Sequence, residues 1–122
     1  MPGDPFTVDS LDWDARGLLP AIAQDAASDE VLMLAWMSPD SLRKTLETGR
    51  VTYWSRSRGA LWEKGASSGH TQRLVELRVD CDRDCLLLRV EQTGPACHTN
   101  RRSCFYTAIR DGREVEILAP EA

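Results

Sequence analysis

Two stretches of alternating apolar residues, out of phase with each other, limit the folds open to this chain more than any other pattern in it. Apolar side chains occupy the odd positions of 75–79 and the even positions of 86–90. Alternate residues of a strand point to opposite faces, so a continuous strand cannot change its buried face without a bulge. The segment between them, DCDRDC at 80–85, is rich in Asp, which favours turns. The sequence therefore predicts two strands joined by a turn over 80–85, with Val75 among the inward residues of the first.

The predicted turn holds three carboxylates within five residues, at Asp80, Asp82 and Asp84. Carboxylates this close repel one another, and the repulsion is relieved by a bound cation or by full exposure to water. Alternate residues around one tight bend can converge on an ion, and oxygen ligands suit Mg²⁺ or Mn²⁺. The turn is therefore a candidate divalent-cation site, and an ordinary charged turn is the alternative.

The same segment begins a series of thiols, with Cys81 followed by Cys97 and Cys104. Structural zinc sites usually pair cysteines two to four residues apart, whereas these are separated by fifteen and then six residues. Three thiolates without a fourth protein ligand would suit a catalytic zinc, which keeps one position open for water. Spacing alone leaves zinc binding and ordinary thiols equally open. A Cys97–Cys104 or Cys81–Cys85 disulfide is a further alternative. Cys85 precedes an apolar run and is expected to be a buried free thiol.

The two histidines of the chain lie near these motifs. His98 follows Cys97 directly, so it can serve as a proton shuttle or a further ligand. His70 lies in a glycine- and serine-rich loop at 64–72, where it can donate a hydrogen bond to a substrate. A lone histidine is more often bound to a backbone group, so both roles depend on the neighbouring motifs.

A helix and several more strands can be read from the sequence. Ser38 and Pro39 are suited to the cap and first position of a helix, and Gly49 to its end. Leu42 and Leu46 supply the apolar stripe of this helix.

Further strands are expected on both sides of this helix. The apolar run at 30–37 predicts a buried strand, and 51–54 predicts another. A second hairpin is expected around Asp111 and Gly112, which form a favoured two-residue turn between alternating segments.

Size and composition indicate a single cytosolic domain over residues 1–122. The chain is 42% apolar, enough for one core, although a second copy would help to bury apolar surface. The first residues carry no basic segment followed by an apolar one, and no apolar stretch is long enough to cross a membrane. Four cysteines in such a protein are thiols or metal ligands more often than disulfides.

The charge distribution favours a substrate with phosphate groups. Residues 50–113 hold twelve Lys or Arg against seven Asp or Glu, whereas the whole chain has a net charge of −4. Cations beside an acidic cluster suggest a site that receives phosphate and holds metal, rather than a nucleic-acid surface. Ordinary solvated charge is the alternative. The chain lacks a Gly-x-Ser-x-Gly elbow, a Walker loop and a Gly-x-Gly-x-x-Gly motif.

Several blocks, in order, resemble the phosphoribosyl-AMP cyclohydrolase family, the enzymes of the third step of histidine biosynthesis. The blocks are GLLPAIAQ (17–24), VLMLAWM (31–37), YWSRSR (53–58), LWEKGASSGHTQ (61–72), DCDRD (80–84), GPACH (94–98) and SCF (103–105). Together they cover residues 17–106. Several ordered motifs are more specific than any one of them, so the resemblance favours metal binding over a charged turn and ordinary thiols.

The resemblance implies a mainly β fold with one or two helices, whose half-barrel-like sheet is completed as an intertwined homodimer in the cytoplasm. It implies active sites at the subunit interface, with zinc held by Cys81, Cys97 and Cys104 and with Cys81 supplied by the partner subunit. It also implies magnesium held by the three aspartates of the 80–85 turn. Sharing between subunits would explain the unusual spacing of the cysteines.

The chain departs from the family pattern at two positions. Cys85 stands where the family has Ala or Thr, and Ala66 stands where Glu is frequent, so no acidic side chain can act at position 66. Some relatives carry a fused pyrophosphohydrolase domain, for which this chain has no room.

The implied reaction opens the adenine ring of phosphoribosyl-AMP to give a formimino carboxamide product. The ribosyl phosphate on N1 makes C6 electron-poor, so water adds to C6 and the N1–C6 bond breaks. Zinc would supply the nucleophile by lowering the pKa of bound water from about 16 toward neutrality. His98 is the candidate base, and His70 the candidate donor to the substrate. Candidates for binding the two phosphates are Arg56, Arg58, Lys64, Ser67, Ser68 and Gly69.

Two other classes of protein fit parts of the pattern. A binding domain stabilised by zinc, without catalysis, would use the thiols structurally and leave the aspartates as a charged turn. A thiol redox protein would use the cysteines without metal. Loss of turnover on mutation of Asp82 and Asp84 separates the first from an enzyme, and stoichiometric zinc under reducing conditions argues against the second.

Overall fold

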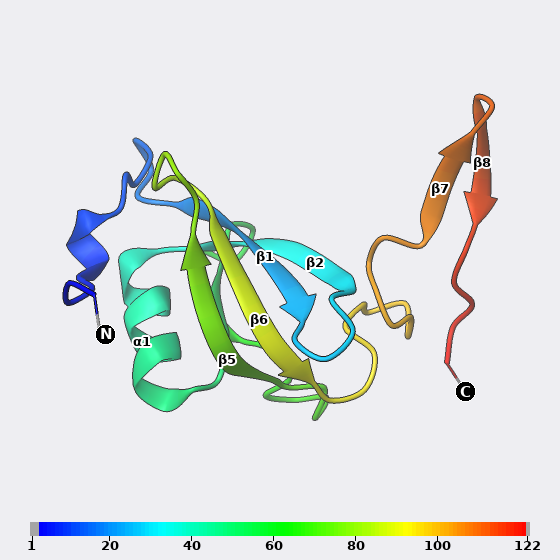
Figure 1. The fold of residues 1–122 in the computed structure, drawn as a ribbon. Helices are drawn as coiled ribbons and strands as arrows, with labels where there is room; N and C mark the ends of the chain where they lie inside the picture. Colours follow the sequence, from blue (N-terminus) through cyan, green and yellow to red (C-terminus); the bar gives the residue numbers. More distant parts are fainter. Residues whose placement is uncertain (1–2, 122) are drawn as a thin grey trace.

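A computed structural model describes residues 3–121, which form a six-stranded sheet, one α-helix, a short 3₁₀ helix and a separate two-stranded hairpin. The elements are η1 Val8–Ser10, β1 Leu19–Asp25, β2 Val31–Met37, α1 Pro39–Thr48, β3 Thr52–Ser55, β4 Ala60–Glu63, β5 Gln72–Val79, β6 Leu86–Gln92, β7 Thr107–Arg110 and β8 Arg113–Glu116. The sheet curls into a half-barrel with α1 beside it (Figure 1). The predicted fold class, mainly β with a helix, is confirmed.

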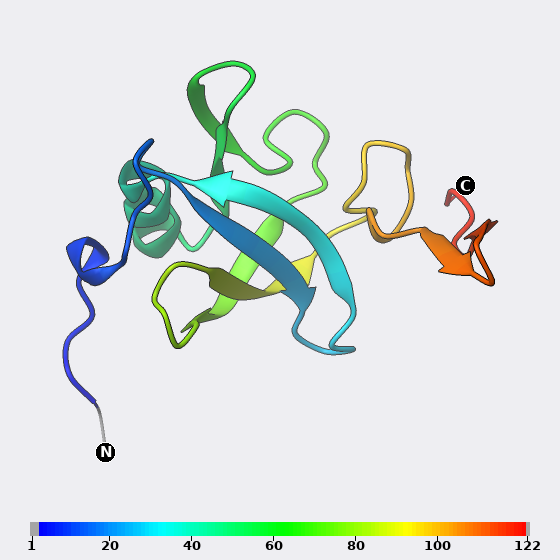
Figure 2. The same cartoon turned by 90° about the horizontal axis from the view of Figure 1, so that it is seen from above.

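The strand order of the large sheet is β4-β3-β2-β1-β6-β5. Its neighbouring strands are antiparallel except β1 and β6, which are parallel. Strand β1 therefore lies at the centre of the sheet and joins the N-terminal half of the chain to the β5–β6 hairpin (Figure 2). Its inward residues Leu19, Ala21 and Ala23 are buried. The sequence pattern did not reveal this strand, because two of its core positions are alanines and Pro20 interrupts it.

The hairpin predicted from the phase change is confirmed. Strands β5 and β6 pair antiparallel with Val79 opposite Leu86, and residues 80–85 form the turn. The prediction that Val75 points inward is wrong, because the register of β5 against β6 shifts between Leu74 and Glu76. Leu74 packs against the core instead, and Val75 is 50% exposed.

Helix α1 starts and ends where the sequence predicts. The Ser38 side chain accepts a hydrogen bond from the Ser41 backbone, and Gly49 ends the helix with φ of +75°. Leu42 is fully buried, but Leu46 is 42% exposed and does not belong to the buried stripe. Thr45 takes that place, because its hydroxyl bonds the backbone of the next strand and holds this turn of the helix against β3.

The second predicted hairpin is also confirmed and stands apart from the sheet (Figure 1). Strands β7 and β8 pair with each other across Asp111 and Gly112, both with positive φ. The apolar side chains of Phe105, Ile109 and Ile117 are exposed on this arm. A two-stranded hairpin is at best marginally stable alone in water, and Arg101 ties this arm to the preceding loop through Glu116 and the Leu118 carbonyl.

Within the described residues, no helix is both long enough and apolar enough to cross a membrane.

Candidate active site

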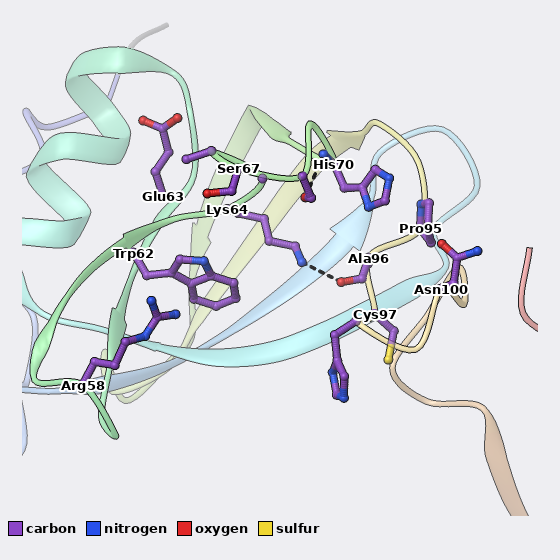
Figure 3. A pocket seen from close by; sticks show the side chains of 14 residues that line it. Arg58, Trp62, Glu63, Lys64, Ser67, His70, Pro95, Ala96, Cys97 and Asn100 are labelled. Atoms are coloured by element: carbon purple, nitrogen blue, oxygen red, sulfur yellow. Dashed lines mark hydrogen bonds between the residues drawn. The ribbon is translucent and has the colours of Figure 1, made fainter.

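Two loops face each other across a cavity of about 470 Å³, a volume typical of small-molecule sites. One loop follows β4, and the other follows β6 and contains Cys97 and His98. Figure 3 shows Lys64 of the first loop reaching toward Ala96 of the second, with the Trp62 ring beside it. The cavity is lined by Arg58, Trp62, Glu63, Lys64, Gly65, Ala66, Ser67, Ser68, His70, Pro95, Ala96, Cys97, His98 and Asn100.

Both predicted histidines line this cavity. The His70 ring lies against Gly94, where a Cβ atom would be 2.6 Å from Cδ2 of His70. A Cβ atom on Gly65 would lie 2.4 Å from the backbone carbonyl carbon of His70. Two glycines, both with positive φ, therefore allow the loops to approach and fix the place of the imidazole. His98 is exposed at the cavity next to Cys97.

Cys97 and Cys104 lie together at the second loop. The Cys97 Sγ and Thr99 Oγ1 are 3.0 Å apart. Burial opposes ionisation of Cys97, but hydrogen bonds from Thr99 outweigh it and lower the pKa of the thiol. Burial of the sulfur and the neighbouring Cys97 raise the pKa of Cys104 to about 11, although the residue as a whole is exposed. The two thiols therefore lie near enough for each to affect the ionisation of the other.

Strand β2 holds Cys104 in place. The backbone N–H of Cys104 donates to the Leu32 carbonyl at 2.7 Å, and the Ser103 hydroxyl donates to the Val31 carbonyl at 2.7 Å. Arg102 adds ion pairs to Asp25 and Glu30. The second thiol is therefore fixed to strand β2 and not carried on an untethered loop.

The aspartates of the 80–85 turn converge as predicted. One side-chain oxygen from each of Asp80, Asp82 and Asp84 lies within 4.8 Å of the other two. Asp80 also accepts hydrogen bonds from the backbone N–H groups of Asp84 and Cys85, which shape the turn. The side-chain hydrogen bond with Asp80, partial loss of hydration and the charges of Asp80 and Asp82 raise the pKa of Asp84. A divalent cation would relieve this repulsion, so the residues fit a hard metal ion.

Cys81 lies away from the other two candidate zinc ligands. It is in the turn before β6, whereas Cys97 follows the opposite end of that strand, roughly 20 Å away at ~3.3 Å per residue. In the part of the chain that the structure describes, only the three aspartates form a cluster of three or more potential ligands. All four cysteines are free, and Cys85 is half-buried, not fully buried as expected.

The candidate phosphate-binding residues divide between two places. Arg58, Ser67 and Ser68 line the cavity. Arg56 instead lies over the Trp36 ring, 4.7 Å from its centroid, and is not among the lining residues. Gly69 is also outside the lining and closes its loop through a hydrogen bond to the Gly65 carbonyl.

Lys64 lines the cavity but is turned toward protein. Its Nζ donates to the Ala96 carbonyl at 2.6 Å and lies 5.4 Å from the centroid of the Trp62 ring (Figure 3). Burial lowers the pKa of Lys64, while the charges of Cys104 and Cys97 oppose that shift.

Sequence reasoning missed Trp62 and Asn100 as lining residues. The partly buried Trp62 ring faces the cavity and stacks at a tilt on Tyr53, with 5.6 Å between ring centroids. The sequence signal that could have identified Trp62 is its position two residues before Lys64, where the predicted loop at 64–72 begins. Nothing in the sequence pattern marks Asn100.

Comparisons with known proteins place this chain in a family. The family model for phosphoribosyl-AMP cyclohydrolase matches residues 33–106. A protein of that name from Dinoroseobacter shibae is 73% identical over 94% of this chain and 97% of its own length. Others from Paracoccus denitrificans and Ruegeria pomeroyi are 72% and 69% identical, over 95% and 98% of this chain and 96% and 98% of their own lengths. The chain therefore belongs to the phosphoribosyl-AMP cyclohydrolase family.

Proposed function

We propose that this protein hydrolyses the N1–C6 bond in the adenine ring of phosphoribosyl-AMP, a step of histidine biosynthesis in the cytoplasm. The observation that carries this proposal is the family match over 33–106, which contains every lining residue of the cavity and all three residues of the aspartate cluster. The cavity has the size and the mixture of cationic, hydroxyl and aromatic groups that a phosphorylated nucleotide requires.

Proton transfer is assigned to the histidines of the cavity. His98 lies beside Cys97, so its imidazole would accept a proton from the water that attacks C6. His70 would donate a hydrogen bond to the substrate from the opposite loop, where Gly94 fixes its ring.

The phosphates of the substrate are assigned to the cationic and hydroxyl groups around the cavity. Arg58 can pair with a phosphate in two hydrogen bonds, and Ser67 and Ser68 add hydroxyl donors. Arg56 and Gly69 complete the candidate set from outside the lining.

The residues present fit two metal ions. Cys97 and Cys104 supply two adjacent thiols, Cys81 of a second copy would supply the third, and the aspartate turn offers oxygen ligands for magnesium. Zinc, when bound, lowers the pKa of a water molecule toward neutrality. The protein's own contribution is to hold the thiols through Thr99 and β2 and to place His98 beside them.

A homodimer is proposed for two reasons. One chain leaves Cys81 at the far end of β6 from Cys97, so the three thiols meet only if a second copy supplies Cys81. The β7–β8 arm also exposes apolar side chains, and an apolar groove of about 260 Å³ at Ile22, Val79 and Leu87 lies beside the aspartate turn. The arm of one copy would cover this groove on the other and bring Cys104, at its base, toward Cys81.

One assay tests the reaction directly. Purified protein loaded with zinc is incubated with phosphoribosyl-AMP and magnesium, and the ring-opened product is followed by its change in ultraviolet absorption. Turnover that is lost in Asp82→Asn, with an unchanged melting temperature, is the expected result. No turnover by folded, metal-loaded protein would contradict the proposal and favour a binding domain stabilised by zinc.

A further inference from the structure

Lys64 is oriented differently from a residue whose main role is to bind a substrate phosphate. Its side chain is half-buried, and its Nζ donates to the Ala96 carbonyl at 2.6 Å. Within residues 3–121 it forms no ion pair with a carboxylate. A half-buried cation without a carboxylate partner is costly unless another negative group lies near it.

The negative groups near Lys64 are thiols. Ala96, which accepts its hydrogen bond, is the residue before Cys97 (Figure 3). The hydrogen bond to Ala96 therefore places the Lys64 ammonium beside the Cys97 backbone, and the charges of Cys104 and Cys97 oppose the lowering of its pKa by burial. Three thiolates around one dication would leave a net charge of −1. An ammonium group beside them would offset this charge and draw electron density away from the sulfur atoms.

We propose that Lys64 is a positioning residue for the zinc ligands, which anchors the Cys97 backbone through Ala96 and offsets the negative charge of the thiolates. This inference rests on the proposed function, and it assigns Lys64 to the metal ligands and not to the substrate's phosphates. It also joins the two loops of the cavity, because Lys64 and Ala96 are 32 residues apart in the chain.

Three substitutions separate the hydrogen bond to Ala96 from the positive charge of Lys64. Lys64→Met removes both, Lys64→Gln keeps an N–H donor for the Ala96 carbonyl, and Lys64→Arg keeps the charge. Loss of a residue that hydrogen-bonds and orients a metal ligand typically weakens metal binding about 10- to 100-fold. Lys64→Met and Lys64→Gln are therefore expected to bind zinc about tenfold more weakly than the wild type, or worse. Lys64→Arg should keep the wild-type affinity within about a few-fold.

Zinc affinity is measured by competition with a chromophoric chelator, on full-length protein whose folding is checked by melting temperature. Cobalt(II) gives a second readout, because the energy of its thiolate charge-transfer band follows the electron density on sulfur. We expect this band to shift in Lys64→Gln and Lys64→Met and to keep its wild-type energy in Lys64→Arg. Lys44→Met is the matched control, since Lys44 is the other lysine of the chain and is exposed on α1.

Other outcomes overturn the inference. If the Met and Gln variants bind zinc as tightly as the wild type and only raise KM for phosphoribosyl-AMP, Lys64 binds a substrate phosphate instead. If Lys64→Gln matches the wild type in zinc affinity and in the energy of the cobalt band, the charge of Lys64 has no role. Zinc affinity and the cobalt band are read without substrate, so absence of turnover by the wild type would contradict the proposed reaction and leave this result unaffected.

Discussion

The Asp25 carboxylate lies 3.1 Å from the Arg102 guanidinium, and this ion pair joins the end of β1 to the segment that carries Cys104. Asp25 is buried, and it also accepts hydrogen bonds from the backbone N–H and the hydroxyl of Ser28. Burial opposes its ionisation, but these hydrogen bonds and Arg102 outweigh it and hold the pKa of Asp25 below its usual value.

Asp25→Asn should therefore destabilise the protein, and the loss should depend on pH. Because the pKa is lower in the folded state, the stabilisation by Asp25 is complete above the unfolded pKa of about 4. It is lost as the pH falls through the folded pKa. We expect a loss of about 1–3 kcal/mol at pH 7, smaller than for a fully buried pair, because Arg102 is partly exposed and keeps Glu30.

Thermal unfolding of wild-type and variant protein at pH 7, 5 and 3 measures this effect. The difference in melting temperature should be the same at pH 7 and 5 and should shrink at pH 3. Glu91→Gln, which breaks the exposed pair with Arg73, is the control and should cost little at any pH. An Asp25→Asn deficit that stays constant down to pH 3 would show that the carboxylate charge is not involved.

Gly94→Ala should displace the His70 ring and reduce turnover. The new methyl group would lie 2.6 Å from Cδ2 of His70, and φ at this position is +70°. We expect a stability loss of about 1–3 kcal/mol from strain and a fall in kcat of about 10- to 100-fold from the shifted imidazole.

Gly59→Ala separates strain from the clash with His70. Gly59 has φ of +60°, but an added Cβ would have nothing within 4 Å. This control should lose stability and keep kcat. In a His70→Ala background, Gly94→Ala should cost less stability than alone, because the ring is gone. Equal losses in both backgrounds would mean that the ring and Gly94 do not compete for space.

Sequence patterns predicted the elements whose signals are local. The phase change located the turn that gathers the three aspartates, and Ser38 with Gly49 located α1. Val75 could not be placed, because a bulge in β5 has no composition signal. Leu46 was assigned to the wrong face because Thr45, a polar residue, occupies the buried position through hydrogen bonds.

The candidate site was harder to predict because its residues meet through long-range contacts. Lys64 and Ala96 are joined across 32 residues, and His70 fits against Gly94, a pairing that no periodicity reveals. Arg56 and Arg58, two residues apart in one motif, lie on different surfaces, because Arg56 turns to the Trp36 ring. The family motifs name these residues as one group and do not indicate how they divide between surfaces.

Asp82→Asn should weaken magnesium binding by tenfold or more without reducing the stability of the metal-free protein. The three carboxylates repel one another when no cation is present, and this repulsion raises the pKa of Asp84. Removing one charge therefore relaxes the turn and at the same time removes a ligand. Manganese(II) binding followed by electron paramagnetic resonance gives the affinity, and Asp111→Asn, in the exposed β7–β8 turn, is the control.

Ile109→Asp should dissociate the proposed dimer and lower its zinc content. Ile109 is 68% exposed in one chain, so a substitution there should cost almost nothing if the protein works alone. If a second copy covers the arm, the new carboxylate is buried in apolar surroundings and association weakens. Light scattering coupled to gel filtration should then show a monomer that binds zinc poorly, because Cys81 of the partner is lost. Leu46→Asp, at an exposed leucine of α1, should remain a dimer. A variant at Ile109 that stays dimeric and holds stoichiometric zinc would exclude the arm from the interface.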